Sequence, residues 1–414
     1  MKEGYKLTEL GDIPESWGVE RLEQYVDIIS GCSPSALALS DAGRFNFYKV
    51  NQLNDFEKYM DNSPFKFDTG NLVSKGAIIF PKRGASIFTN KIRLLSKPAF
   101  FDTNVMSLAT REGLDNEYLF YCLQEFNLSR IADTSSIPQI NNKHINPLQI
   151  RLPPLPEQQK ITSILSTVDE KIENIDAQIT QTQQLKKALM QQLLTKGIGH
   201  TKFKSSELGD MPESWEVVKL GKVSDIKRGL ASHQLTYVED AFKGVRLIRI
   251  NDFKSFEPKY IIETADTKNL TIKVGDVLMA GTGATAGISR LVDESWDGLP
   301  FSYNAPRIRA KSALDCKYLY YALNTESISM QQNSLFTGNA QPFLDTRAIA
   351  SLKIPFPHTV EQLKIASILS ATDEKIYSLQ SRKKAYQQLK KGLMQQLLTG
   401  KLRVNTEIKE PTLA

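Results

Sequence analysis

The chain has 414 residues, of which 41% are hydrophobic and 24% are charged. This is the composition of an ordinary globular protein with room for two or three domains, and it excludes a disordered or fibrous chain. With 52 Lys and Arg against 46 Asp and Glu, the net charge is +6, which is compatible with a polyanionic partner.

No stretch of the sequence predicts secretion or membrane insertion. The N-terminal residues MKEGYKLTEL have no apolar signal core, and no run approaches the roughly 18 apolar residues of a membrane span. Cys32, Cys122 and Cys316 are far apart and in no C-x-x-C spacing, so we expect buried thiols rather than disulfides. These features predict a cytoplasmic protein.

The sequence contains an internal repeat. LGDIPESW at residues 10–17 returns as LGDMPESW at 208–215, and NEYLFYCL, ending at Leu123, returns as CKYLYYAL, ending at Leu323. The offset between the copies grows from 198 at the first motif to 204 in the last quarter of the chain, so small insertions account for the difference. We therefore expect the two halves to share one fold.

Each half begins with a globular domain whose pattern is mostly that of strands. FNFYKV at 45–50 and VRLIRI at 245–250 alternate as half-buried strands do, and GAIIF and GDVLM are short apolar runs that begin with Gly. LDNEYLFYCLQEF at 114–126 and LDCKYLYYALNTE at 314–326 are apolar at helical spacing and predict one amphipathic helix per domain. The expected fold class is α+β, with two pseudo-symmetric α/β domains.

Basic and amide side chains recur at equivalent places in both halves, mostly on loops that follow strands. Arg and Lys suit phosphates and guanine edges, whereas Asn and Gln suit adenine. The alternative for any single residue is an ordinary solvated loop, but the recurrence favours contacts with DNA. The candidate DNA-binding residues are Lys49, Lys82, Arg83, Lys91, Arg93, Gln139, Asn141, Asn142, Lys143, Lys227, Arg228, Arg246, Arg249, Thr282, Thr285, Asn339 and Gln341.

Patterns for catalysis or metal binding are not found. The Gly-rich run GTGATAG at 281–287 lacks the Lys and the spacing of a phosphate loop, and no Asp- or Asn-Pro-Pro-aromatic run of an amino-methyltransferase occurs. His144, His200, His233 and His358 are scattered without metal-ligand spacing. We therefore expect a noncatalytic chain with no metal and no cofactor of its own.

Each half ends in a long helical stretch that is nearly identical in the two copies. EQQKITSILSTVDEKI begins at Glu157 and EQLKIASILSATDEKI at Glu361, and Gly197 and Gly400 follow the closing LMQQLLT. Apolar residues recur at intervals of four and three over about five heptads, which predicts a coiled coil between the copies, and we expect the two helices to run antiparallel. The alternative is that each seam packs on its own globular neighbour. The apolar seam residues are Ile161, Leu165, Val168, Ile172, Ile175, Ile179, Ile365, Leu369, Ile376, Leu379, Leu393 and Leu397.

These observations predict two globular domains, two helical regions and a loose C-terminal tail. The predicted boundaries are 1–155 for the N-terminal segment and first domain, 156–197 for the central helical region, 198–358 for the second domain, 359–400 for the C-terminal helical region and 401–414 for the tail.

The whole chain resembles a known family. The strings LPPLPEQQKI and DEKI, the ending LMQQLLTGKLRV and the opening LGDIPESW are similar to those of the specificity (S) subunit of Type I restriction–modification systems. The resemblance implies that two target-recognition domains read a bipartite, asymmetric double-stranded DNA site, one half per domain. It also implies that the helices set the spacer between the halves.

The resemblance implies partners as well. Subunits of this kind recruit two modification (methyltransferase) subunits, which bind S-adenosylmethionine, and restriction subunits, which use ATP and Mg for translocation and cleavage. The exposed helix faces are the expected docking surface. The run at 281–287 lacks the basic residues of PKRGA, so the two domains are not expected to make identical contacts. The residues alone leave two alternatives open, a protein-binding structural adaptor and an enzyme that acts alone.

Overall fold

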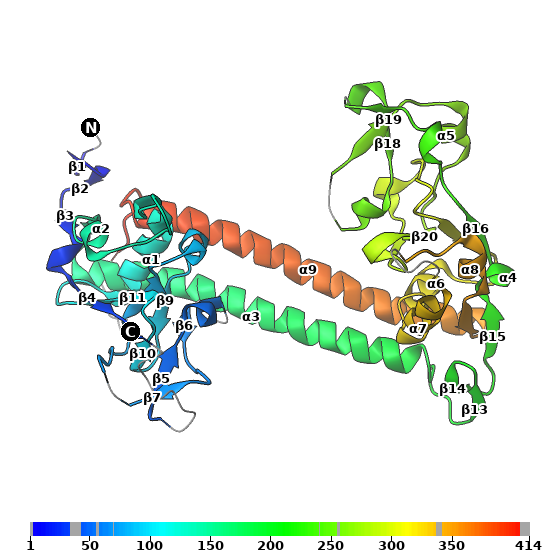
Figure 1. The fold of residues 1–414 in the computed structure, drawn as a ribbon, viewed down its shortest axis with the longest axis horizontal. Helices are drawn as coiled ribbons and strands as arrows, with labels where there is room; N and C mark the ends of the chain where they lie inside the picture. The colour runs from blue at the N-terminus through cyan, green and yellow to red at the C-terminus, as the bar shows by residue number, and fades with distance from the viewer. Residues whose placement is uncertain are drawn as a thin grey trace, which may run out of the picture. The chain divides into compact units, whose positions relative to one another are not determined.

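The computed structural model describes residues 3–33, 43–54, 58–68, 70–239, 241–254, 257–336 and 342–405. It separates into two compact units, Met1–Asp176 with Arg382–Ala414, and Ala177–Ser381. Each unit combines a globular domain of strands and short helices with part of each of two long helices (Figure 1). The prediction of an α+β fold is confirmed.

The domain of the first unit is built on a five-stranded sheet in which β11 pairs antiparallel with both β4 and β8. A three-stranded sheet, the β1–β2 hairpin and the antiparallel pair of β3 with the distant β12 complete it. The elements are β1 (Tyr5–Thr8), β2 (Gly11–Pro14), β3 (Gly18–Arg21), β4 (Val26–Ser30), β5 (Phe45–Tyr48), β6 (Tyr59–Met60), β7 (Lys66–Phe67), β8 (Ile78–Pro81), β9 (Arg93–Leu95), β10 (Ala99–Phe101), β11 (Val105–Thr110), α1 (Asn116–Phe126), α2 (Asn142–Ile145) and β12 (Gln149–Leu152).

The domain of the second unit repeats this plan. Its sheet has the order β16–β22–β20–β21, which matches β4–β11–β8–β9 of the first unit strand for strand. The elements are β13 (Phe203–Ser206), β14 (Gly209–Pro212), β15 (Glu216–Lys219), α4 (Leu220–Val223), β16 (Ser224–Lys227), β17 (Tyr237–Val238), β18 (Val245–Leu247), β19 (Lys259–Ile261), α5 (Ala265–Asn269), β20 (Val277–Met279), β21 (Ser289–Leu291), β22 (Arg307–Ala310), α6 (Cys316–Ala322), α7 (Glu326–Leu335), α8 (Thr346–Ser351) and β23 (Lys353–Phe356).

Some predicted elements are shorter than their patterns. The strands expected over 45–50 and 245–250 end at Tyr48 and Leu247, where the backbone turns into short 3-10 helices. The helix expected over 314–326 ends at Ala322, because the Thr325 side chain accepts a bond from the Ile328 amide and starts a second helix. A side-chain cap of this kind defines a new N-terminus.

The two long helices, α3 (Leu155–Leu193) and α9 (Thr359–Leu397), lie side by side and antiparallel in each unit (Figure 1). In the first unit, Ile161 and Leu165 share a core cluster with Leu397, and this cluster includes the sheet of the domain. In the second unit, Leu193 of α3 shares a cluster with Leu369 of α9. The antiparallel pairing is thereby confirmed, and near the helix ends the seams also pack on the domains.

Ion pairs define the register of the helix pair. Asp169 pairs with Lys390 at 2.6 Å and Asp176 with Lys383 at 2.7 Å in the first unit. Lys186 pairs with Asp373 at 2.5 Å in the second. The residue numbers of each pair add to 559, so both units have the same antiparallel register. Three lysines therefore occupy heptad seam positions because an aspartate of the facing helix neutralises each.

The apolar seam residues are shielded from solvent to different degrees. The buried ones are Ile161, Leu165, Val168, Ile175, Ile365, Leu369, Leu379 and Leu397, and the half-buried ones are Ile172, Ile179, Ile376 and Leu393.

The segment after α9 is not a loose tail in its described part. Gly400 has a φ of +72° and lies so close to Pro14 that a Cβ atom would approach its ring to 2.4 Å. The Tyr5 hydroxyl donates to the Gly400 carbonyl at 2.7 Å, and Arg403 pairs with Glu157. The prediction of a loose terminus is therefore wrong for residues 401–405, because a buried carboxylate anchors them.

Two predictions from composition have clear structural outcomes. No helix in the described ranges is both long and apolar enough to cross a membrane. Cys32, Cys122 and Cys316 are free thiols, but they are half-buried rather than buried.

Candidate nucleic-acid interface

Two loops of the first domain that carry predicted contacts are paired through their backbones. The loop after β8 contains Lys82 and Arg83, and Arg83 forms an isolated antiparallel bridge with Gln139. The Gly84 amide donates to the Pro138 carbonyl at 2.8 Å, and the Ile140 amide donates to the Lys82 carbonyl at 2.8 Å. The structure therefore brings together basic and amide side chains that are more than 50 residues apart in the sequence.

The second domain pairs the equivalent loops in the same way. Thr282 forms an antiparallel bridge with Phe343. The Gly283 amide donates to the Pro342 carbonyl at 3.1 Å, and the Leu344 amide donates to the Gly281 carbonyl at 2.8 Å. The backbone arrangement is retained while the side chains are changed.

The two cations of the first loop differ in their surroundings. The Arg83 side chain is exposed. Lys82 is half-buried, and its Nζ donates to Oγ of Ser30 at 3.0 Å. Burial lowers the pKa of the Lys82 ammonium, although the charge of Asp102 acts in the opposite direction. Arg83 is therefore the better placed of the two for an exposed polyanion.

Arg228 has aromatic neighbours in the second domain. Its guanidinium carbon lies 4.1 Å from the ring centroid of Tyr303 and 5.0 Å from that of Phe343. Planar guanidinium groups stack on aromatic faces, and the stacking limits their rotamers. Because Phe343 also bridges Thr282, the structure places Arg228 beside the loop pair. Tyr303 and Phe343 are not in the predicted set, since neither carries a charge or an amide.

Three predicted contacts are engaged inside the protein. Arg93 lies within β9 and is 8% exposed, so it is not on the loop where we expected it. Arg246 and Arg249 both reach Asp252, whose side chain is fully buried, at 3.4 and 3.5 Å. Alternation along VRLIRI indicated a strand face, but the buried carboxylate holds these guanidinium groups against the domain.

The remaining predicted residues are on other parts of the two domains. Asn141, Asn142 and Lys143 are exposed at the start of α2, where the Asn141 amide donates to Nδ1 of His144 at 3.1 Å. The Lys49 Nζ lies 3.8 Å from the ring centroid of Phe65. Lys91 and Thr285 are half-buried, Lys227 is exposed, and Asn339 and Gln341 lie outside the described residues.

A duplicated set of polar contacts joins each domain to its helices. Trp17 and Trp215 of the PESW motifs donate their indole N–H to Glu157 and Glu361, both at 2.9 Å. These glutamates begin the two repeated helical sequences, which explains why the PESW motif and the helical sequence recur together. Arg403 completes the first set, and His200, 2.8 Å from Glu361, completes the second.

The glutamine that follows Glu157 or Glu361 holds the loop before α1 in the first unit and the loop before α6 in the second. The Gln158 side chain accepts from the Asp115 amide at 2.8 Å, and Gln362 accepts from the Asp315 amide at the same distance. Both glutamines are fully buried. Satisfied buried amides hold a single geometry, so each domain is fixed to its own helix end.

The described residues contain no group of three or more His, Cys, Asp or Glu side chains that could hold a metal ion.

Comparison with known proteins identifies the family. Residues 14–184 and 212–389 match the family of the Type I restriction modification DNA specificity domain. The chain is 30% identical over 411 residues to the Type I restriction enzyme MjaVIII specificity subunit of Methanocaldococcus jannaschii, covering 95% of this chain and 94% of that protein. It is 25% identical over 215 residues to the EcoBI specificity subunit of Escherichia coli, covering 47% of this chain and 45% of that protein.

Solved structures agree in fold. The crystal structure of the Type I restriction–modification S subunit from M. genitalium has a TM-score of 0.60 at 16% identity and covers 92% of this chain and 96% of that one. A chain from a study of the assembly and conformational transition of a Type I system has a TM-score of 0.56 at 18% identity and covers 94% and 99%. With its two matched specificity domains and its antiparallel helices, the chain belongs to the Type I restriction–modification specificity subunits and is a noncatalytic DNA-recognition subunit.

Proposed function

We propose that each globular domain reads one half of a bipartite, asymmetric double-stranded DNA site. The observation that carries this proposal is the loop pair that recurs with one backbone arrangement and two side-chain sets. The first domain presents Arg83 and Gln139, and the second presents Thr282 beside Arg228. One scaffold with two chemistries suits two half-sites of different sequence.

The contacts that we propose fall into two groups. Arg83, Gln139, Asn141 and Asn142 suit base edges, whereas exposed lysines such as Lys143 and Lys227 suit phosphates. Arg93, Arg246 and Arg249 would contact DNA only if their internal positions changed.

The helices are proposed to set the spacer and to dock two modification subunits. The seams are occupied by the helix pair itself, which leaves the outer faces for partners. These faces carry exposed apolar side chains, namely Leu185 (53% exposed), Leu363 (52%), Tyr377 (73%) and Leu389 (48%). Exposed apolar residues on a charged helix are typical of a protein interface.

We base the proposed roles of the partner subunits on the family to which the chain belongs. The modification subunits would supply S-adenosylmethionine binding and adenine methylation, and the restriction subunits would supply the chemistry of ATP and Mg. The complex would act in the cytoplasm. Within this chain, the first recognition domain is proposed to lie in residues 1–155 and the second in 198–358, with helical regions at 156–197 and 359–400.

Methylome sequencing of a host that carries this chain with its modification subunits tests the proposal. The expected product is N6-methyladenine at one asymmetric motif of two half-sequences separated by a spacer of fixed length. A palindromic motif, or a motif without a spacer, would contradict the two-reader arrangement.

A heptad insertion tests the helices as the element that sets the spacer. The register places the gap between residues 177 and 178 opposite the gap between 381 and 382, so seven residues added at both points preserve the seam. Each helix then lengthens by about 10 Å, or about three base pairs of DNA. A longer spacer with unchanged half-sequences is expected, and changed half-sequences at constant spacing would refute the role of the helices.

Two simple measurements distinguish the proposed DNA-recognition subunit from an adaptor that binds only proteins and from an enzyme that acts alone. Affinity of the assembled complex for DNA should fall steeply with salt, because neutralised phosphates release counterions. The purified chain without partners should neither methylate nor cut DNA.

A further inference from the structure

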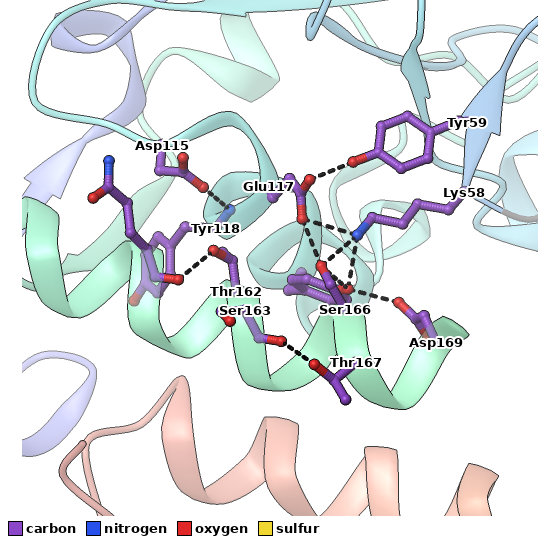
Figure 2. A network of polar contacts seen from close by, with 12 residues as sticks. Lys58, Tyr59, Asp115, Glu117, Tyr118, Thr162, Ser163, Ser166, Thr167 and Asp169 are labelled. Carbon is purple, nitrogen blue, oxygen red and sulfur yellow. Dashed lines mark hydrogen bonds and ion pairs between the residues drawn. The ribbon is translucent and has the colours of Figure 1, made fainter. Parts of the chain in front are cut away.

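Lys58 is a buried cation of the first domain that the proposed DNA interface does not use. It precedes β6 and is 6% exposed. Its Nζ donates to Oε2 of Glu117 at 2.9 Å, to the Tyr121 hydroxyl at 3.1 Å and to Oγ of Ser166 at 2.7 Å. Figure 2 shows this ammonium between α1, which carries Glu117 and Tyr121, and α3, which carries Ser166. Three acceptors match the three ammonium protons.

The network extends to neighbouring elements on both sides. The Tyr59 hydroxyl donates to Glu117, which ties β6 to α1 (Figure 2). On the other side, the Tyr121 hydroxyl donates to Oδ2 of Asp169 at 2.6 Å, and Lys390 of α9 pairs with Oδ1 of the same carboxylate at 2.6 Å. Lys58 therefore connects the edge of the recognition sheet to both long helices.

In its described residues, the second unit retains only part of this network. The Tyr321 hydroxyl donates to Asp373 at 2.7 Å, as Tyr121 does to Asp169. Lys317, however, takes the place of Glu117 in the repeat. An open hollow of about 420 Å³ lies beside Lys317 and Ser370, the counterparts of Glu117 and Ser166 in the repeat; it is lined by Asp315, Lys317, Leu363, Ala366, Ser367, Ser370, Ala371 and Glu374.

Stability alone does not account for a buried ammonium at this position. Desolvation offsets most of the attraction in a buried ion pair, so its net contribution to folding is small. Its geometric demand is large, because the bonds to Glu117 and Tyr121 hold the ammonium within the domain, and the bond to Ser166 crosses to α3 and is lost if the domain rotates on the helix. A group of this kind fixes an orientation more than it adds free energy.

We propose that Lys58 is a positioning residue that locks the first recognition domain to α3 and so restricts the spacer to a single length. This inference rests on the proposed reading of a bipartite site. The orientation of the domain on the helix sets where its half-site lies along the duplex. If the domain could change its orientation on α3, the complex would accept half-sites whose spacing is one base pair shorter or longer.

The test uses the complete methyltransferase, assembled from this chain and its modification subunits, on DNA that carries both half-sites at spacers from two base pairs shorter to two longer than the native one. Wild type should methylate one spacer length. The Lys58→Met variant keeps the stem of the side chain and loses the charge. Its preference for the native spacer over the neighbouring ones should fall about tenfold, with both half-sequences unchanged.

Two variants complete the design. Lys317→Met, a matched change beside the hollow of the second unit, should keep the spacer preference of wild type. Ser166→Ala removes one acceptor of Lys58 and keeps the ion pair between Lys58 and Glu117. It should also weaken the preference for the native spacer. This variant provides the test if the Lys58→Met complex does not assemble.

Three outcomes are decisive. Unchanged spacer preference in an assembled Lys58→Met complex, or in Ser166→Ala when Lys58→Met does not assemble, overturns the lock. Altered half-sequences at constant spacing overturn it too, since Lys58 would then take part in reading DNA. A wild-type complex with no bipartite site would refute the proposed function itself, whatever the variants do.

Discussion

The indole Nε1 of Trp17 donates a 2.9 Å hydrogen bond to Oε2 of Glu157, a glutamate whose side chain is 3% exposed. Arg403 donates to both oxygens of the same carboxylate, at 2.7 and 2.9 Å. One buried carboxylate therefore joins the N-terminal motif, the start of α3 and the segment after α9. Bidentate pairs of this kind combine charge with a fixed geometry.

Replacing Glu157 with Ala should destabilise the first unit strongly. The variant leaves the Trp17 N–H buried without an acceptor and Arg403 without its partner, at a cost of about 3 kcal/mol in the free energy of unfolding. Chemical denaturation of the full chain measures the change. Glu23→Ala removes an exposed pair with Arg21 at 3.8 Å and should cost less than about 1 kcal/mol. If the two substitutions lowered the free energy of unfolding equally, the buried Glu157 carboxylate would contribute no more to stability than an exposed one.

Truncation of a buried seam residue should destabilise the protein more than truncation of an exposed residue on the same helix. Leu369 is fully buried, whereas Leu363 on the same helix is 52% exposed. We expect Leu369→Ala to lower the free energy of unfolding by about 3 kcal/mol, because it leaves a cavity. Leu363→Ala should change it by no more than about 0.5 kcal/mol. If the chain unfolds in separate steps, the transition of the second unit is the one to follow.

The charge of Glu117 should make the first domain sensitive to acid. Burial by itself raises the pKa of this carboxyl, but bonds from Tyr59, Lys58 and Ser166 outweigh it and hold the pKa below its ordinary value of 4.5. A carboxyl with a lowered pKa stabilises the fold above its ordinary pKa, and this contribution is lost as the pH falls through the folded-state pKa. Wild type should therefore be more stable than Glu117→Gln at pH 7, and the difference should shrink below about pH 4.5. Denaturation midpoints at several pH values test this, and a difference that stays constant with pH would contradict it.

Arg83→Ala should weaken recognition of the first half-site. Loss of a bidentate contact to guanine costs about 1–3 kcal/mol and relaxes specificity at that base, whereas loss of a phosphate contact weakens all sequences equally and reduces the salt slope by about 1. Binding of the assembled complex to matched and mutated sites at several salt concentrations distinguishes these cases. Arg111, which pairs with Asp27 at 2.7 Å, offers a control whose replacement should leave DNA affinity unchanged. Wild-type affinity in the Arg83 variant would remove this residue from the interface.

Much of the fold could be predicted because it depends on local periodicity. The heptads of α3 and α9 and the turn residues Gly197 and Gly400, with φ of +66° and +72°, follow directly from the sequence. The lysines at seam positions could not be interpreted without the facing helix. Lys383 and Lys390 look like interruptions of an apolar pattern until Asp176 and Asp169 are placed opposite them.

The candidate interface could be predicted only in part, for a similar reason. The sequence identifies residues 81–85 (PKRGA) and 137–144 (IPQINNKH) as polar loops, but it does not predict that their backbones pair, because that pairing depends on the order of strands in the sheet. Arg246 and Arg249 could not be separated from exposed arginines, because the buried Asp252 gives no sequence signal. Lys58 lies in the polar string NDFEKYM, which resembles a surface segment, and only the packing of α1 on α3 reveals its role.

The basic side chain that contacts Glu157 or Glu361 comes in each case from the segment that follows the opposite helix. Glu157 starts α3 and is met by Arg403, which follows α9, whereas Glu361 starts α9 and is met by His200, which follows α3. A chimaeric chain in which one globular domain is exchanged at a junction inside a helix therefore requires a compatible residue outside the exchanged domain. The Arg403 guanidinium donates to both oxygens of Glu157, whereas the His200 ring contacts Glu361 through one nitrogen, so a hybrid that places His opposite Glu157 should be less stable than one that keeps Arg.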